Sequence, residues 1–271
     1  MTAVTDVSYR SGWSVLICNR IADLHLCAST DAFQCFPFYT YHGEDETRQE
    51  NIAHSTLLNF QEHYTDKRVT KWDIFQYVYA MLHHPDYRMR YSANLRRELP
   101  RIPMVGGNDA KVFRAYVEIG RKLAGLHVNY DNCAEYPLQG IEDRKKKLNW
   151  HVEKMRLSKD KTKIIYNDFL TLAGVPEAAF SYRLGNRSAL EWVIDQYQMT
   201  TDSRSAITND PNRDDEPDYI VKLIGKVITV SLETQKLISK LPALSTDSSV
   251  ADVLPDFPMA AESPSNYGNP K

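Results

Sequence analysis

Residues 70–103 read TKWDIFQYVYAMLHHPDYRMRYSANLRRELPRIP and predict two consecutive helices. Thr70, followed three residues later by Asp73, favours a capping box with Asp in place of the usual Glu or Gln. The sequence His83-His84-Pro85 interrupts the helical pattern, and Pro85 suits the first turn of a second helix. Apolar residues at helical spacing form one stripe on the first helix, comprising Ile74, Phe75, Val78, Tyr79 and Leu82. The stretch therefore predicts a helical hairpin, whose second member is basic through Arg88, Arg90, Arg96 and Arg97.

The residues before this hairpin predict a small sheet. Two short apolar and aromatic runs, Trp13–Cys18 and Gln34–Tyr41, are typical of strands. Pro37 favours an edge position or a bulge, because proline cannot donate to a strand ladder. The acidic, polar segment 42–49 is expected to be a loop.

Further helices follow from apolar spacing and from capping residues. Asn108 ends a Gly-Gly turn and is the expected N-cap of one helix, and Ser188 is the expected cap of another. The predicted helices cover Ile52–Tyr64, Asp109–Val128, 188–198 and Glu216–Leu241.

Beyond residue 140 the pattern changes to short β-prone runs. Trp150–Leu157 alternates, and two further runs flank Asn167-Asp168, a pair that suits a hairpin turn. Residues 176–180 predict a helical turn, and Gly185-Asn186 predicts another tight turn.

Together these elements predict an α+β fold. We expect a helical subdomain and a small mixed or antiparallel β-containing subdomain, closed by a long C-terminal helix. The expected segments are a partial β segment (1–47), a helical subdomain (48–140), a β-plus-helix subdomain with the closing helix (141–243) and a disordered tail (244–271).

Several longer segments of the sequence resemble those of one known family. Besides residues 70–103, these segments are QCFPFY at 34–39, GRKLA at 120–124, LHVNY at 126–130, KIIYN at 163–167, GNRSALEW at 185–192 and NDPN at 209–212. In this order they resemble the C-terminal target-recognition region of type ISP single-polypeptide restriction–modification enzymes and of related helicase–methyltransferase fusions. The resemblance spans residues 12–243.

The resemblance implies a role in restriction–modification and phage defence. In full-length relatives, this region follows a methyltransferase domain and clamps duplex DNA against it, while a nuclease and a translocase lie further upstream. The implied partners are therefore double-stranded DNA and N-terminal methyltransferase, translocase and nuclease domains or subunits. Because few residues precede the first matching strand, we expect an expressed piece of a larger enzyme, a split gene or a truncated remnant. A strand edge left unpaired in Trp13–Tyr41 would favour dimerisation.

The composition is that of a globular chain without a membrane segment. A length of 271 residues with 42% hydrophobic content can bury a core. No apolar run approaches the ~20 residues of a membrane span, and the N-terminus lacks the layout of a signal peptide. The cysteines lack zinc-finger spacing, which predicts four reduced thiols in a cytoplasmic protein: Cys18, Cys27, Cys35 and Cys133.

The charges are segregated along the chain although the formal net charge is only −2. Residues 144–163 hold nine Lys and Arg against two acids, while acids concentrate at 44–50, at 210–218 and after 241. A neutral protein with this distribution can present a positive face to phosphates. The alternative is that these runs are only solvated faces.

The sequence lacks the motifs of the relatives' catalytic domains. Residues 209–212 have neither the second proline nor the aromatic residue of an amino-methyltransferase motif, and no glycine-rich or Walker loop occurs. Asp143-Arg144-Lys145 matches a nuclease triplet but lies in a charged segment that is unlike a buried strand. His83-His84 has no nearby nucleophile and is better explained as a helix end. We therefore expect no catalytic residue, no metal site, no cofactor and no enzyme activity of this chain by itself.

The candidate DNA-binding residues lie in the second half. Arg183, Asn186 and Arg187, on the turn before Ser188, have base-reading chemistry, since Arg suits guanine and Asn suits adenine. Arg88, Arg96 and Arg97 form a secondary basic cluster. Candidate phosphate contacts, which position a protein without specifying sequence, are Lys145, Lys146, Lys147, Lys154, Arg156, Lys159, Lys161 and Lys163.

Two of these assignments have structural alternatives. The segment at 185–192 is also an ordinary helix start. The secondary basic cluster of Arg88, Arg96 and Arg97 could dock against a neighbouring domain. The leading hypothesis is a non-catalytic DNA target-recognition module that positions duplex DNA for a methyltransferase or nuclease absent from this chain. The rival is a scaffold or docking domain for partner subunits, without DNA binding. A third possibility, a nuclease, would depend on Asp143.

Overall fold

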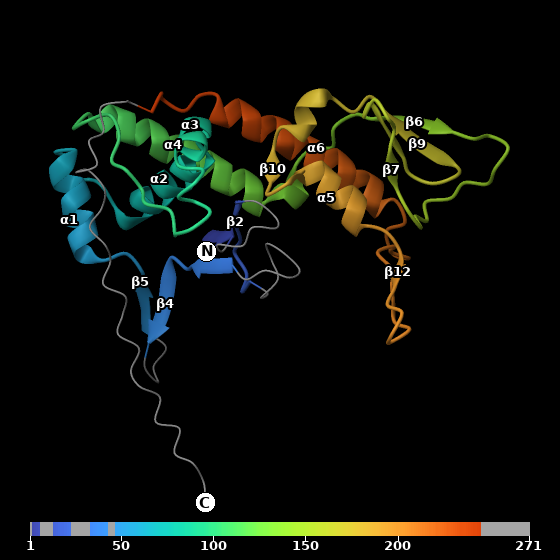
Figure 1. The fold of residues 1–271 in the computed structure, drawn as a ribbon, viewed down its shortest axis with the longest axis horizontal. Coiled ribbons are helices and arrows are strands. Elements are labelled where there is room, and N and C mark those ends of the chain that lie inside the picture. The colour runs from blue at the N-terminus through green and yellow to red at the C-terminus, as the bar shows by residue number, and fades with distance from the viewer. Residues whose placement is uncertain (1, 6–12, 23–32, 43–46, 245–271) are drawn as a thin grey trace, which may run out of the picture.

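The computed structural model describes residues 2–5, 13–22, 33–42 and 47–244, and Figure 1 shows their arrangement. Helices make up most of the first half, and short antiparallel sheets make up much of the second, so the expected α+β class is confirmed. The helices are α1 (His54–His63), α2 (Lys71–His83), α3 (Pro85–Arg90), α4 (Ala110–Val128), α5 (Ala189–Gln196) and α6 (Tyr219–Ile238).

The pair α2 and α4 forms the centre of the helical half. The predicted capping box is present, because Thr70 Oγ1 accepts from Asp73 N at 3.1 Å and Asp73 Oδ2 accepts from Thr70 N at 2.9 Å. The two helices approach closely at Gly120, where an added Cβ would lie 1.9 Å from Gln76 O. Glycine is therefore required at this crossing.

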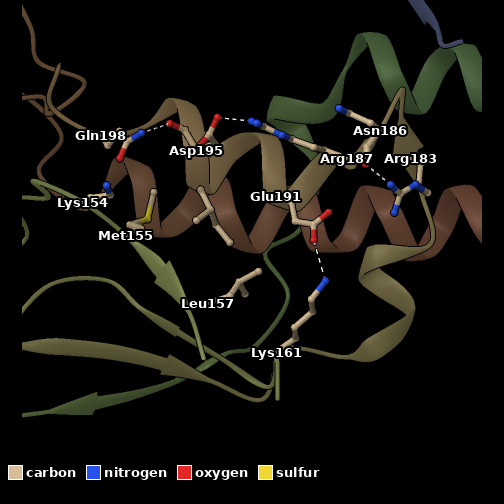
Figure 2. A pocket seen from close by; sticks show the side chains of 11 residues that line it. Lys154, Met155, Leu157, Lys161, Arg183, Asn186, Arg187, Glu191, Asp195 and Gln198 are labelled. Carbon is tan, nitrogen blue, oxygen red and sulfur yellow. Dashed lines mark hydrogen bonds and ion pairs between the residues drawn. The ribbon is translucent and has the colours of Figure 1, made fainter. Parts of the chain in front are cut away.

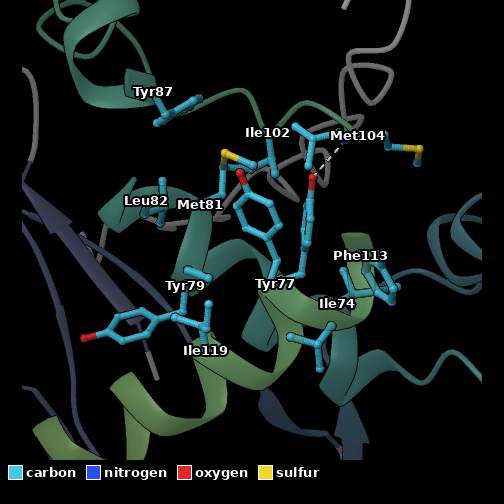
Figure 3. Close-up of a cluster of buried hydrophobic side chains, with 14 of the residues drawn as sticks. Ile74, Tyr77, Tyr79, Met81, Leu82, Tyr87, Ile102, Met104, Phe113 and Ile119 are labelled. Carbon is cyan, nitrogen blue, oxygen red and sulfur yellow. Dashed lines mark hydrogen bonds between the residues drawn. The ribbon is translucent and has the colours of Figure 1, made fainter. Parts of the chain in front are cut away.

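Tyrosines dominate the core around this helix pair (Figure 3). Their rings are buried, and three of their hydroxyls donate to backbone carbonyls, since buried polar groups require partners. Tyr77 donates to Pro103 O at 2.6 Å, Tyr64 to Val105 O at 3.0 Å and Tyr87 to Arg101 O at 2.8 Å. These bonds tie the extended segment 101–105 to the helices.

The N-terminal strands differ from the sequence prediction. A three-stranded antiparallel sheet has the order β2-β1-β3, while β4 pairs with β5 in a separate hairpin. The expected single strand over 34–41 is thus two strands in different sheets, because Pro37 cannot continue the ladder and Asn51 bonds to the carbonyls of Pro37 and Phe38. The loop predicted over 42–49 is also partly wrong, because residues 47–49 belong to strand β5. The strands are β1 (Thr2–Thr5), β2 (Val15–Ile17), β3 (Phe33–Phe36), β4 (Tyr39–His42) and β5 (Thr47–Glu50).

The second half is built on a four-stranded antiparallel sheet with the order β6-β9-β8-β7. The expected hairpin turn at Asn167-Asp168 is confirmed, since Asn167 Oδ1 accepts from the N–H groups of Phe169 and Leu170. Two smaller hairpins, β10–β11 and β12–β13, lie on either side of α5 in the sequence. The strands are β6 (Gln139–Glu142), β7 (Arg156–Leu157), β8 (Lys163–Ile165), β9 (Leu170–Ala173), β10 (Arg183–Leu184), β11 (Arg187–Ser188), β12 (Thr200–Thr201) and β13 (Thr208–Asn209).

Two local predictions in these regions need correction. Asp109, not Asn108, caps α4, because its side chain accepts from Lys111 N at 2.8 Å. Only the last two residues of the alternating run 150–157 form a strand. The backbone of Val152 bonds to the side chain of Asn212 instead of to a neighbouring strand. The expected helical turn is confirmed as η2 (Glu177–Phe180).

The closing helix α6 contributes to two hydrophobic cores. Its first turns place Ile220, Ile224 and Ile228 in the core of the β half, and Ile238 reaches the core of the helical half. Figure 1 shows α6 running from the β half toward the helical half, where it lies along α4. Leu244, just beyond this helix, is also buried, and the remainder of the expected disordered tail, 245–271, lies outside the described residues.

A buried polar cluster lies where the halves meet. His127 on α4 bonds to Tyr79 OH at 2.7 Å and to Thr234 Oγ1 at 2.8 Å, and its ring stacks on Tyr182. Burial lowers the pKa of His127 to about 4, so the ring is neutral at pH 7. His83 Nδ1 bonds to Tyr79 O, and its other ring nitrogen has no hydrogen-bond partner among the described residues.

The expected helix break at His83-His84 is confirmed. His84 caps α3, because its Nδ1 accepts from Asp86 N at 3.1 Å. Its Nε2 lies 3.0 Å from Pro242 O, which also ties the end of the chain to the helical half.

Candidate nucleic-acid interface

A pocket lies between α5 and the edge of the sheet (Figure 2). This pocket has a volume of about 470 Å³. Five of the predicted site residues line it: Lys154, Lys161, Arg183, Asn186 and Arg187. Its remaining lining consists of Met155, Leu157, Glu191, Ile194, Asp195 and Gln198.

The β10–β11 hairpin and the start of α5 position three of these side chains. Gly185 has a φ of +67°, the left-handed conformation that lets the chain turn between Arg183 and Arg187. The expected cap is confirmed, because Ser188 Oγ accepts from Glu191 N at 3.2 Å and Glu191 Oε2 accepts from Ser188 N at 2.9 Å. Trp192 Nε1 donates to Leu184 O at 3.1 Å and fixes the hairpin against the helix.

Acidic side chains of α5 hold two of the pocket's cations. Arg187 forms an ion pair with Asp195, and its guanidinium lies 5.6 Å from the centre of the Trp192 ring. Lys161 Nζ lies 2.9 Å from Glu191 Oε1. Although partial burial opposes it, hydrogen bonds from Ser188 and Lys161 lower the pKa of Glu191 to about 2. These pairs orient the cations in the absence of any ligand.

Most other cations of the β half have no such partner. Lys146, in the turn that follows β6, forms an ion pair with Asp168 at 2.7 Å. Of the eight predicted phosphate contacts, the other six are exposed and form no ion pair with any described residue: Lys145, Lys147, Lys154, Arg156, Lys159 and Lys163. Arg156, Lys159 and Lys163 belong to the β7–β8 hairpin, and Lys154, just before it in the chain, lines the pocket, so unpaired positive charge lies both on the hairpin and at the pocket.

The secondary cluster does not form one surface. Arg88 is enclosed by the helical half, where its Nε donates to Leu82 O at 2.6 Å and its guanidinium lies over the Trp13 ring. Burial lowers its pKa to about 10. Arg96 and Arg97 are exposed in the turns after α3. Arg88 is therefore a packing residue in this structure and does not join the other two.

The sequence reasoning missed the acidic residues and the apolar floor of the pocket. Arg187, Glu191 and Asp195 are spaced by four residues, and this helical spacing is the signal that predicts side chains on one face. The floor residues Met155 and Ile194 come from segments far apart in the sequence, and no local pattern brings them together.

No other chemistry emerges from the described residues. Among them, no three His, Cys, Asp or Glu side chains converge in a way that could hold a metal ion. None of the helices in the described ranges could cross a membrane. Cys35 and Cys133 are free thiols, Cys18 Sγ donates to Arg20 O at 3.4 Å, and Cys27 lies outside the part of the chain that the structure describes.

The mixed α+β fold is the one expected for a DNA specificity domain. The chain belongs to the Type ISP C-terminal specificity domain family, whose model matches residues 1–223. The resemblance deduced from the sequence is therefore confirmed. Among curated proteins, no match to the chain was found.

Three solved structures share this fold at 32–35% sequence identity, each aligned over 90% of this chain. They are the ATP-dependent Type ISP restriction–modification enzyme LlaBIII bound to DNA (TM-score 0.77, 32% identity), a nuclease-deletion mutant of LlaGI with a DNA substrate mimic (0.72, 35%) and a DrdV–DNA complex (0.76, 33%). The matched region covers 16%, 21% and 24% of those chains, respectively.

Proposed function

We propose that this chain recognises a DNA target for a restriction–modification enzyme of the Type ISP kind. It would bind duplex DNA through the basic face of its β half and position it for methyltransferase and nuclease domains outside the matched region. The observation that carries this proposal is the group of unpaired cations on and beside the β7–β8 hairpin, together with a pocket that Lys154 lines along with Arg183, Asn186 and Arg187.

The two groups of residues suit different parts of a duplex. Arg156 and the five unpaired lysines are exposed, and exposed cations without partners suit contacts to phosphates. Arg187 is held by Asp195 and Trp192, so its remaining N–H groups point in a fixed direction. A preorganised guanidinium of this kind suits bidentate donation to guanine O6 and N7, and the Asn186 amide suits adenine.

The relatives support DNA as the partner, since three of them were solved in complex with DNA or a DNA substrate mimic. This chain spans about a sixth to a quarter of their length, so methylation, cleavage and translocation would belong to other domains or subunits. The proposed role places the protein in the cytoplasm. Dimerisation through the outer strands β2 or β3 stays a prediction.

A binding titration tests the proposal. The chain is mixed with a randomised duplex pool, fluorescence anisotropy is followed as the salt concentration rises, and the bound fraction is sequenced. If the six unpaired cations each neutralise one phosphate, log K falls against log salt with a slope of about −5. Enrichment of one motif in the bound fraction establishes sequence reading.

The rival role as a docking domain predicts a different result. In that case the chain would bind no duplex at low salt, and it would co-elute with a separately purified methyltransferase portion in gel filtration. Salt-dependent binding that enriches no motif would support the proposed phosphate contacts and contradict sequence-specific recognition.

A further inference from the structure

The β12–β13 hairpin projects from the β half beside α5 (Figure 1). Every residue from Thr200 to Asn209 is exposed. Among them is Ile207, whose side chain remains 69% accessible to solvent. An isoleucine at this position adds nothing to a hydrophobic core, so the fold alone does not account for it.

The hairpin is rigid in spite of its exposure. Asp202 Oδ1 accepts three hydrogen bonds at its tip, from Arg204 N at 3.0 Å, Ser205 N at 2.7 Å and Ser205 Oγ at 2.9 Å. Asp202 N donates to Ile207 O at 3.0 Å, and the hydroxyls of Thr201 and Thr208 lie 2.9 Å apart across the strands. The tip is therefore preorganised, and binding would cost little ordering entropy.

Both legs of the hairpin are anchored next to the pocket. On one side, Met199 N donates to Glu153 O at 2.9 Å. On the other side, the side chain of Asn212 bonds to both Val152 N (2.8 Å) and Val152 O (2.9 Å). The pocket-lining residues Lys154 and Gln198 directly adjoin these anchors in the sequence. The hairpin thus rises from the rim of the proposed DNA-binding surface.

The hairpin differs in charge from the surface around it. Asp202 and Arg204 are its only charged residues, so its net charge is zero, and the Asp202 carboxylate is already engaged by N–H and O–H groups. A neutral ribbon gains little from phosphates. Its exposed hydroxyls, its guanidinium and its apolar tip suit base edges instead.

The dimensions also fit a groove. Three paired positions per leg, Thr200–Asp202 against residues 207–209, give at ~3.4 Å per residue a reach of about 10 Å before the turn is counted. The major groove is about 12 Å wide and about 8.5 Å deep, and it admits a two-stranded ribbon.

We propose that the β12–β13 hairpin enters the major groove of the bound duplex, where Ile207 contacts a thymine methyl group and Arg204 donates to a guanine. This inference rests on the proposed function, because the basic face must hold the duplex beside the hairpin. It adds a second recognition element, outside the residues that line the pocket.

Two variants of the full chain test the proposal, Ile207→Ala and Arg204→Gln. Neither side chain is buried, so both variants should fold. We expect Ile207→Ala to bind the random duplex pool with unchanged affinity and salt slope, and Arg204→Gln, which loses one positive charge, to bind the pool only slightly more weakly. Each should also lose enrichment at one position of the selected motif and bind the wild-type motif about 5- to 150-fold more weakly. Met89→Ala, which removes another exposed apolar side chain in the helical half, is the matched control and should retain the full motif.

Replacing thymine by uracil in the selected motif isolates the methyl contact. At the position read by Ile207, this change should weaken wild-type binding and leave binding of Ile207→Ala unchanged. If the wild-type chain selects a motif and both variants select the same motif, the hairpin proposal alone is overturned. The hairpin would then suit a protein partner. No duplex binding by the wild-type chain would overturn the proposed function and this inference together.

Discussion

The helical half and the β half use their charged residues in opposite ways. In the helical half, Arg114 bridges two buried carboxylates, with Nη2 at 2.8 Å from Asp66 Oδ2 and Nη1 at 3.0 Å from Asp73 Oδ2. Hydrogen bonds from Arg68 and Arg114 hold the pKa of Asp66 far below its usual range. In the β half, six exposed cations have no partner of this kind among the described residues.

The difference distinguishes charges that stabilise the fold from charges that are available to a ligand. A buried carboxylate without its cation would be costly, so Arg114 is committed to Asp66 and Asp73. The exposed lysines of the β half contribute little to stability and remain free to bind external anions. Position and pairing, more than the number of basic residues, therefore separate the two halves.

The largest expected effect concerns the packing of the helical half. Gly120→Ala would place a Cβ within 1.9 Å of Gln76 O, so α2 and α4 must separate. We expect a loss of about 3 kcal/mol or more in the free energy of unfolding, measured by chemical denaturation. Gly125→Ala on the same helix is the control, because its Cβ would meet no atom within 4 Å. It should stabilise the protein by about 0.5–1 kcal/mol, since alanine favours helix. Equal effects of both changes would contradict the close crossing.

A second expected effect lies where the two halves meet and depends on pH. The folded-state pKa of His127 is about 4, below its unfolded value of about 6.5. As the pH falls, the unfolded chain therefore binds the proton before the folded chain does. The free energy of unfolding keeps the full contribution of His127 above pH ~6.5. It decreases by about 3 kcal/mol in total as the pH drops toward 4. Denaturation at a series of pH values should show this loss, and His127→Gln should flatten the curve in that window. An unchanged slope in the variant would show that other groups cause the acid sensitivity.

A smaller expected effect concerns binding and leaves stability nearly unchanged. Replacing Arg156 and Lys159 together by Gln should reduce the slope of log K against log salt by about 2. Its matched control is the same double change at Arg96 and Arg97, which are also exposed but lie in the helical half. Both variants should remain within about 0.5 kcal/mol of wild-type stability. Equal loss of DNA binding in the two variants would remove the proposed difference between the halves.

The smallest expected effect concerns the acid that orients Arg187. Asp195→Asn breaks an exposed ion pair, so the change in stability should stay below about 1 kcal/mol. Binding to random duplex should tighten slightly, because a negative charge leaves the basic surface. Enrichment of the base read by Arg187 should weaken, because the guanidinium is then free to rotate. Glu118→Gln on α4 is the control and should change neither quantity.

Local signals predicted most of the helices. The caps at Thr70 and Ser188 and the apolar stripes of α2 and α4 depend on residues three or four apart, and each formed as expected. The strands depend on distant partners, which explains why the run 34–41 split at Pro37 and why most of the run 150–157 stayed unpaired.

The candidate site was predictable as a set of basic residues but not as an arrangement. Charge counts indicated the β half, and the turn at Gly185 indicated Arg183 and Arg187. The burial of Arg88 depends on contacts with Trp13, 75 residues earlier, and no local pattern reveals such a contact. The same holds for the bond between Asn212 and Val152 that anchors the β12–β13 hairpin.

The path of α6 constrains how specificity could be exchanged between relatives by protein engineering. In a chimera that carries the β half of one relative (the donor) on the helical half of another (the host), α6 would contact both parts. Ile220, Ile224 and Ile228 complete the core of the β half, while Thr234 and Ile238 contact the helical half. A chimera cut at the start of this helix would leave the transplanted core open along one side. The grafted cassette should therefore run from β6 through Ile228, with the junction placed inside the helix at residues 229–233.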